Sequence, residues 1–185
     1  MRILPKADFP LIETRRLLEP GPVVLLSSAH RGERNIMTMG WHMMLGFSPA
    51  LVACYIWPGN RSHELVKRSR ECVINIPTRA LLDQVVGIGN STGADVDKFA
   101  QFDLTPQSAV EVAAPLIGEC FANLECRLAD ASQINRYDLF IWQVVKAHVA
   151  IEPASPQTLH YLGQGEFMVA GKVVNCRRRF KAQNL

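Results

Sequence analysis

The segment Asn35-Ile36-Met37-Thr38-Met39-Gly40-Trp41 is the most informative stretch of this 185-residue chain. The run 22–28 before it is apolar and β-branched, and a polar turn at 29–34 separates the two, so a β-hairpin is predicted whose second strand covers 35–45. Its side chains suit neither a dry core nor a solvated face. Such a strand offers backbone amides and flat apolar surface to a planar polar ligand.

The rest of the chain predicts a mainly β fold with a few helices. Further strands are predicted at residues 51–56, 72–76, 119–129, 139–151 and 167–176. Helices are predicted at 62–70, from 77 to about 87 and around 95–102. This order does not alternate regularly, as a parallel α/β sheet would require. We therefore expect antiparallel, Greek-key-like strands that form a barrel of about six or more strands.

Composition predicts one globular domain over residues 1–185, with an N-terminal arm at 1–20 and a basic C-terminal tail at 177–185. Apolar residues make up 48% of the chain and charged residues 20%, which excludes a disordered class. The net charge of +3 suits an anionic small ligand and gives no support for nucleic acid or membrane as a partner. No run approaches the roughly 20 apolar residues that span a bilayer.

The cysteines predict a reducing compartment. There are five, an odd number, and none form a pair at metal-ligand or redox-motif spacing. A disulfide framework and a zinc site are therefore not expected. No signal peptide is visible at the amino terminus. We expect a soluble protein of the cytoplasm, without a bound metal.

Arg61-Ser62-His63 stands at the predicted start of a helix. Free backbone amides and the helix dipole at such a position favour a bound anion. The Ser62 hydroxyl and the forked guanidinium of Arg61 add donors for a phosphate. The alternative is an ordinary helix cap beside a surface arginine. For His63, contact with the phosphate and a place on the helix surface both remain open.

A second candidate anion site is the loop Asn90-Ser91-Thr92-Gly93, followed by Lys98. Its two hydroxyls, its glycine and the lysine suit a phosphate. Alternatively, Lys98 simply pairs with Asp95 or Asp97 at the surface. There is no Walker-type lysine motif, and the glycines at 87 and 89 lack the pattern of a dinucleotide fingerprint, so a Rossmann unit is not expected.

Taken in order, Asn35–Trp41, Arg61-Ser62-His63 and the segment from Ser91 through Asp97-Lys98-Phe99 resemble the flavin reductase-like family. That family has a split β-barrel that binds flavin mononucleotide (FMN), and it includes the flavoredoxins. The resemblance runs from about Pro22 to Phe167. It implies that three residues lie along the isoalloxazine, largely through backbone contacts: Asn35, Met37 and Thr38. It implies that five others surround the ribityl chain and phosphate: Arg61, Ser62, Ser91, Thr92 and Lys98.

The resemblance also implies a homodimer with each flavin near the subunit interface. Trp41 departs from the small polar residues of dedicated flavin reductases and is closer to the flavoredoxin branch. We expect Trp41 to contact the ring, either by stacking on it or by restricting nicotinamide access. Trp57 and Trp142 are expected in the core or an interface.

The histidines are candidates for proton transfer. His148 lies in a predicted strand, where a structural role with satisfied hydrogen bonds is favoured. His160 is expected at the surface, and the alternative for it is a place on the open flavin face of a dimer. No catalytic triad is apparent, so the catalytic residues are left unassigned. If FMN binds, the cofactor supplies the chemistry, and the protein supplies orientation and electrostatics.

Three functions follow as hypotheses. The first is an oxidoreductase that moves reducing equivalents between NADH or NADPH and flavin or another acceptor. The second is a non-enzymatic FMN carrier that transfers electrons to a partner protein. The third is a split-barrel protein that binds a different ligand, such as haem or a pyridoxal species.

Overall fold

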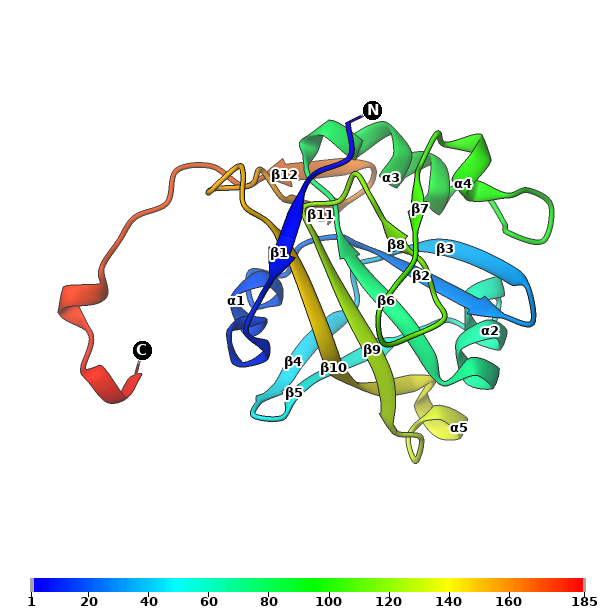
Figure 1. Cartoon of the computed structure of the whole chain (residues 1–185), viewed down its shortest axis with the longest axis horizontal. Coiled ribbons are helices and arrows are strands. Elements are labelled where there is room, and N and C mark those ends of the chain that lie inside the picture. Colours follow the sequence, from blue (N-terminus) through cyan, green and yellow to red (C-terminus); the bar gives the residue numbers. More distant parts are fainter. Residues whose placement is uncertain (1, 185) are drawn as a thin grey trace.

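The structure is a computed structural model, and it describes residues 2–184. Met1 and Leu185, the outermost residues of the expected arm and tail, lie outside the described residues. An antiparallel sheet dominates the fold, as expected (Figure 1). Along it the strands follow the order β3 (Glu33–Met39), β2 (Val24–His30), β6 (Glu71–Ile76), β9 (Ala122–Asp130), β10 (Leu139–Ala150), β5 (Ala50–Tyr55) and β4 (His42–Phe47).

Shorter elements cover the sheet. A strand in the N-terminal arm, β1 (Lys6–Asp8), pairs with β10. The α-helices are α1 (Arg15–Leu18), α2 (Arg61–Ser69), α3 (Leu82–Gly89), α4 (Lys98–Gln101) and α5 (Ile134–Tyr137). Single-turn 3₁₀ helices span Leu11–Glu13, Arg79–Leu81, Arg177–Arg179 and Ala182–Asn184. Two small hairpins complete the fold: β7 (Pro106–Gln107) with β8 (Leu116–Ile117), and β11 (Leu159–Gly163) with β12 (Glu166–Val169).

The predicted strand 35–45 is wrong in one respect, because the chain breaks it into two strands at Gly40 and Trp41. On one side β3 pairs with β2, and on the other β4 pairs with β5, so the two halves belong to opposite ends of the sheet. Between them, the Trp41 carbonyl accepts a hydrogen bond from the Tyr55 N–H (3.1 Å). The apolar pattern continues across the break, but the neighbouring strand changes there.

The predicted strand 167–176 is also too long. β12 ends at Val169, and the chain from 170 onward leaves the body of the molecule as an extended arm (Figure 1). Val173 and Val174 are 73% and 72% exposed. Their β-branched side chains favour extended backbone, yet among the described residues no strand pairs with them.

Two hydrophobic cores lie on opposite faces of β3, because successive side chains of a strand point to opposite faces. Met37 packs with residues such as Leu26 in the larger core, which also holds Trp142. Ile36 packs with Val85 of α3 in the second core. The α3 and α4 helices and the β11–β12 hairpin therefore gather over one end of the sheet (Figure 1).

Candidate functional site

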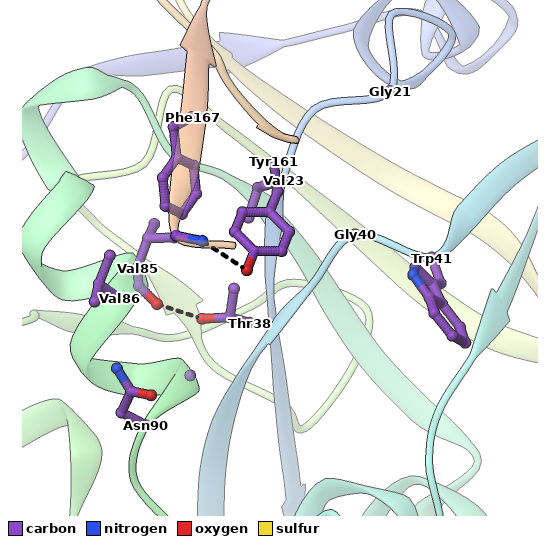
Figure 2. A pocket seen from close by; sticks show the side chains of 12 residues that line it. Gly21, Val23, Thr38, Gly40, Trp41, Val85, Val86, Asn90, Tyr161 and Phe167 are labelled. Carbon is purple, nitrogen blue, oxygen red and sulfur yellow. Dashed lines mark hydrogen bonds between the residues drawn. The ribbon is translucent and has the colours of Figure 1, made fainter. Parts of the chain in front are cut away.

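A cavity of about 520 Å³ lies where the joint between β3 and β4, helix α3 and the β11–β12 hairpin meet (Figure 2). This volume is within the range of small-molecule and cofactor sites. Its lining combines backbone-exposing glycines, aromatic rings and short apolar side chains. These residues are Gly21, Val23, Thr38, Gly40, Trp41, Val85, Val86, Gly89, Asn90, Tyr161, Gly165 and Phe167.

The floor of the cavity is fixed by a contact between β3 and α3. The Thr38 hydroxyl donates a hydrogen bond to the Val85 carbonyl (2.7 Å), drawn as a dashed line in Figure 2. Gly89, one turn further along α3, lies beside Thr38, since a Cβ added there would contact the threonine side chain at 3.7 Å. The hydrogen bond thereby holds together Thr38 and Val85, which lie almost fifty positions apart in the sequence.

One wall is aromatic and comes from the β11–β12 hairpin. The rings of Tyr161 and Phe167 lie with their centroids 5.1 Å apart. The Tyr161 hydroxyl accepts a hydrogen bond from the Gly165 N–H (3.1 Å). Gly163 and Gly165 have positive φ angles of 95° and 85°, which the tight turn requires and which other residues rarely adopt.

Trp41 stands at the opposite side of the cavity in Figure 2, at the joint between β3 and β4. Its side chain is 71% exposed, and its ring lies against Tyr55 with centroids 5.2 Å apart. The sequence predicted a ring-contacting residue here. A large, exposed aromatic surface at the edge of the cavity suits that role.

Next to the cavity, Asn35 joins two of the predicted segments. Its side-chain Nδ2 donates to the Ser62 hydroxyl (3.0 Å), and Ser62 is completely buried. The Asn35 Oδ1 atom is buried without a hydrogen-bond partner among the described residues. A Cβ added at Gly93 would lie 2.1 Å from that oxygen, so the loop at 91–93 also closes on Asn35.

Lys98 is the most unusual charged residue of the site. Its side chain is only 5% exposed, and Nζ donates to the Ile88 carbonyl (3.0 Å). The Ser91 hydroxyl also donates to that carbonyl (3.4 Å). Burial lowers the pKa of Lys98 to about 8. Among residues 2–184, no carboxylate forms an ion pair with it, although buried charges normally have a partner.

Asp97 does not neutralise Lys98. Its carboxylate pairs with Arg34 (2.8 Å) and accepts from the Phe99 N–H (3.0 Å), so it caps α4. The Arg34 guanidinium, which lies over the Phe99 ring, therefore holds the pKa of Asp97 below its usual range. The alternative reading of Lys98 as a surface partner of Asp97 is wrong.

Arg61 is held by two carboxylates. Its guanidinium Nε donates to Glu33 (2.6 Å), and a second nitrogen contacts Glu64. The hydrogen bonds from Arg61 lower the pKa of Glu33. Arg61 lies at the first position of α2, directly before Ser62, as predicted. A role on phosphate stays a prediction.

The other predicted residues are spread more widely. His63 contacts Asp138 (Nε2 to Oδ1, 3.1 Å) and packs edge-on against Phe140, so its ring is engaged with the β10 side of α2. The Met37 side chain lies in the larger core, which leaves its backbone for a ligand. Thr92 is exposed, and its hydroxyl accepts from the Ala94 N–H (3.3 Å).

Some expectations for the remaining histidines and tryptophans are confirmed, and others are not. His148 contacts the buried carboxylate of Glu125 (2.6 Å), which confirms a structural role. His160 was expected at the surface and is instead 9% exposed, with contacts to the Gly21 carbonyl and the Thr158 hydroxyl. Trp142 is in the core as expected. Trp57 is exposed, so of the two expected places, core or interface, only the interface stays a prediction for it.

The segment Tyr161–Phe167 agrees with the family resemblance, but the sequence assigned no ligand role to its two aromatic residues. Tyr161 and Phe167 lie more than 120 positions after Thr38 in the chain, so no local motif connects them. The available signal was a pair of aromatic residues that flank two glycines at the turn of a short hairpin. Val85 and Val86 fall in the helix predicted from 77 to about 87, and both line the cavity.

The described residues contain no cluster of three or more His, Cys, Asp or Glu side chains arranged to hold a metal ion. None of their helices has the length and apolar character that a membrane crossing requires.

A family model described as "Flavin reductase like domain" matches residues 15–171. The uncharacterized protein YddH of Escherichia coli is 33% identical, with the alignment covering 86% of this chain and 92% of YddH.

Among solved structures, an FMN-binding domain of a flavin reductases-like enzyme from Shewanella baltica matches with a TM-score of 0.88 and 27% identity. That match covers 95% of this chain and all of the other. The flavoredoxin of Desulfovibrio vulgaris shares the fold, with a TM-score of 0.77, 22% identity, and coverage of 88% of this chain and 92% of the flavoredoxin.

Proposed function

Because the chain belongs to the flavin reductase-like family and has its FMN-binding split-barrel fold, we propose that it is an FMN-dependent oxidoreductase. It moves reducing equivalents between NADH or NADPH and an electron acceptor. When bound, FMN supplies the hydride and electron transfer, and the residues of this chain bind it, orient it and exclude water.

The observation that carries this proposal is Lys98. A buried ammonium group without a carboxylate partner is costly unless an anion completes its surroundings. It lies one residue after the cap of α4, and its Nζ shares the Ile88 carbonyl with Ser91. Ile88 directly precedes Gly89, which lines the cavity. The FMN phosphate is an anion that would pair with Lys98.

The polar contacts around Asn35 support a ligand that extends from the cavity. Ser62 stands at the start of a nine-residue helix, where backbone amides favour an anion. Asn35 holds the Ser62 hydroxyl and keeps an unpartnered Oδ1 that can accept a hydrogen bond. The resemblance implies a place for Asn35 along the isoalloxazine, but its contacts with Ser62 and the Gly93 loop favour the ribityl and phosphate part. We assign Asn35, Ser62, Ser91 and Lys98 to that part, with Arg61 and Thr92 at its margin.

The ring of FMN would contact the β3 side of the cavity. Thr38 and Gly40 present backbone there, and the Thr38 hydroxyl is already committed to Val85. Trp41 supplies apolar surface at the edge. When bound there, FMN would supply the redox chemistry, and the backbone of β3 at Thr38 and Gly40 would hold its ring, so no acidic or basic side chain is required at the ring.

We also propose a homodimer, located in the reducing environment of the cytoplasm. On β4, alternate side chains face outward: Met43, Leu45 and Phe47 are all exposed. A contiguous exposed apolar strip of this kind is characteristic of an interface. All five cysteines are free thiols, which supports a reducing compartment. A Phe47→Lys variant should sediment as a monomer, whereas an unchanged mass would contradict this interface.

The test of the proposed function is a titration of purified chain with FMN and with riboflavin, which lacks the phosphate. FMN should bind with 1:1 stoichiometry and much more tightly than riboflavin. Failure to bind FMN, or binding of haem or a pyridoxal compound instead, would overturn the proposal. Anaerobic mixing of the FMN-loaded protein with NADH or NADPH should then bleach the visible flavin band.

A second function, an FMN carrier that serves a redox partner protein, is favoured by the exposure of Trp41 at the edge of the cavity. An exposed aromatic ring is a suitable contact for a docking protein. The carrier function predicts that neither nicotinamide nucleotide bleaches the flavin, whereas a reduced partner flavoprotein does so rapidly. Prompt bleaching by NADH or NADPH alone would exclude the carrier as the main function.

A further inference from the structure

A second cavity, of about 700 Å³, lies where three segments of the chain meet. These segments are the N-terminal arm with α1, the loop after β10, and the first residues of the C-terminal arm (residues 170–184). The start of the C-terminal arm is held there, because the Ala170 N–H donates to the Thr158 carbonyl (2.9 Å). In the N-terminal arm, the Phe9 N–H donates to the Ala147 carbonyl of β10 (3.0 Å). The volume is within the range of sites for small organic molecules.

The strand β11 lies between this second cavity and the first one. Successive side chains of a strand point to opposite faces, so His160 lines the second cavity and Tyr161 lines the first. The His160 ring nitrogens contact the Gly21 carbonyl (3.1 Å) and the Thr158 hydroxyl (3.0 Å), so this ring is engaged with the protein. The two cavities have no lining residue in common. A ligand in the second cavity therefore occupies a separate site.

Much of the lining of the second cavity is apolar and belongs to the larger hydrophobic core. Ile76 and Phe121 are core residues with 1% and 5% exposure. Phe9 and Val149 pack against the same core. Ile151 also lines the cavity and is 71% exposed. A hydrocarbon group placed here would be removed from water, which contributes about 25 cal/mol for each Å² of apolar surface buried.

The charged side chains that line the second cavity are basic. Arg16 and Lys172 are among the lining residues, which include no aspartate or glutamate; Glu152 lies in the adjoining loop but is not one of them. Lys172 forms no ion pair within residues 2–184. Arg16 pairs with Glu13 through one nitrogen (3.1 Å), and its guanidinium has five N–H donors, so a ligand can share it. The charge of the cavity therefore suits an anion.

The C-terminal arm is a poor occupant of this cavity. Beyond Val173 it extends away from the body of the molecule (Figure 1). Its charged side chains, Arg177–Arg179 and Lys181, have the same sign as Arg16 and Lys172. Because like charges repel, a ligand of opposite charge is favoured over this arm and over the arm of a second copy.

We propose that the second cavity is a binding site for a small apolar carboxylate. The hydrocarbon part of this ligand lies on the core surface at Phe121 and Val149, and its carboxylate accepts hydrogen bonds from Arg16 and Lys172. Such charge-assisted hydrogen bonds are about twice as strong as neutral ones. The site does not depend on FMN, because none of its residues lines the first cavity.

The experiment is isothermal titration of the full chain, without FMN, with 2-naphthoate and with 2-naphthamide. These probes have nearly the same shape, and only 2-naphthoate is charged at neutral pH. We expect 2-naphthoate to bind with 1:1 stoichiometry and at least about fivefold more tightly than the amide. Added salt should reduce this preference, because the cations are exposed. Equal binding of the two, tighter binding of the amide, or no saturable binding of 2-naphthoate would overturn the proposal.

Titrations at other conditions identify the cavity that is occupied. FMN-loaded protein should bind 2-naphthoate with the same stoichiometry, whereas displacement of 2-naphthoate by FMN would place it in the first cavity and overturn the proposal. Binding that disappears as the protein concentration is raised would assign the second cavity to a contact between two copies, and would also overturn it. Failure of the chain to bind FMN is a failure of the proposed function alone, because the 2-naphthoate titration needs no flavin.

Lys172→Glu tests the carboxylate contact. It should weaken 2-naphthoate binding about tenfold and leave 2-naphthamide binding unchanged, because it replaces a cation with an anion. The matched control is Lys181→Glu, which makes the same change of charge further along the arm, outside the cavity. Equal losses in the two variants would mean that only the net charge of the protein matters, and would contradict a built site.

Ile151→Ser tests the apolar contact. It removes apolar surface from the lining without opening the core, so both probes should bind about three- to fivefold more weakly. Val110→Ser is the control, because Val110 is also exposed and lies outside the cavity. Wild-type affinity in Ile151→Ser together with wild-type affinity in Lys172→Glu would place 2-naphthoate elsewhere on the protein and overturn the proposal.

Discussion

Gly93 lies directly against Asn35: a single methyl group added at Gly93 would come within 2.1 Å of the Asn35 side-chain oxygen. The φ angle of Gly93 is not in the left-handed region, so the backbone itself would accept a side chain. A side chain at position 93 is prevented by the close approach of the loop to β3. The same approach holds an unpartnered oxygen in a fixed position beside Ser62.

Gly93→Ala is therefore expected to weaken FMN binding. The added methyl group must displace the Asn35 carboxamide or lift the loop, and either change disturbs the hydrogen bond to Ser62. Loss of one hydrogen bond corresponds to about a five- to tenfold increase in Kd, measured by flavin fluorescence. Gly171→Ala, where nothing lies within 4 Å of an added Cβ, is the control. Equal affinity in both variants would contradict the role of the Asn35 contact.

Lys98→Met should weaken FMN binding by at least about tenfold, because charge-assisted hydrogen bonds are worth about 1.5–3 kcal/mol. Riboflavin binding should change little, since riboflavin has no phosphate. The FMN-free variant should be at least as stable as the wild type in urea, because the substitution removes a buried cation without a counter-ion. Equal losses for FMN and riboflavin would place Lys98 at the ring instead of the phosphate.

The pKa of Lys98 predicts opposite pH effects on binding and on stability. In the FMN-free protein this pKa is lowered from 10.5 to about 8 by burial. As the pH rises above 8, the folded protein releases this proton while the unfolded chain retains it, so this group makes the FMN-free protein more stable toward pH 10. Over the same interval, FMN affinity should fall, because the cation is lost.

Lys98→Arg separates this effect from other titrations. Arginine stays charged throughout the range, so the decline in FMN affinity above pH 8 should largely disappear in this variant. Isothermal titration at several pH values provides the measurement. A decline of the same size in the arginine variant would assign the titration to a different group.

Trp41→Ala should raise the Kd for FMN about five- to tenfold through the loss of apolar contact with the ring. Trp57→Ala removes a comparably exposed indole elsewhere and serves as the control. In a Trp57→Phe background, added FMN should quench the exposed Trp41 much more than the buried Trp142. Quenching that is unchanged when Trp41 is removed would show that this tryptophan does not face the flavin.

Glu125→Gln should destabilise the fold by about 2 kcal/mol, because this fully buried carboxylate accepts from the backbone N–H groups of Val110, Glu111 and Val112 and contacts His148. Burial alone raises the pKa of Glu125, but these hydrogen bonds lower it overall.

The contribution of Glu125 is therefore present above its ordinary pKa and is lost as the pH falls below about 4. Urea unfolding at neutral and acidic pH gives the measurement. The difference between wild type and Glu125→Gln should shrink in acid. Glu166→Gln, on the exposed hairpin, should leave the pH dependence unchanged. A difference that persists in acid would argue against the pKa shift.

Local patterns predicted much of the fold, and the failures have physical reasons. The apolar run 22–28 and the polar turn at 29–34 predict the hairpin of β2 and β3 from sequence alone, whereas the burial of Ile36 and Met37 on two opposite faces is known only from the structure. The break at Gly40 is not predicted by the sequence, because apolar residues continue on both sides of it and only the neighbouring strand changes. The sequence offered two places for Lys98, a phosphate site or a surface ion pair with one of the two aspartates that precede it. In the structure Lys98 is buried, and Asp97 forms its ion pair with Arg34 instead, a residue 63 positions earlier.

The two terminal strands of the sheet, β3 and β4, are consecutive in the chain and meet at Gly40 and Trp41. This joint is the seam of the barrel, and the cavity opens directly on it. A cofactor bound there would contact both edge strands of the sheet, β3 and β4. It would link two strands that do not pair with each other through backbone hydrogen bonds. FMN binding would then stabilise both edge strands. Amide hydrogen exchange should slow together in β3 and β4, including positions far from any contact with the flavin.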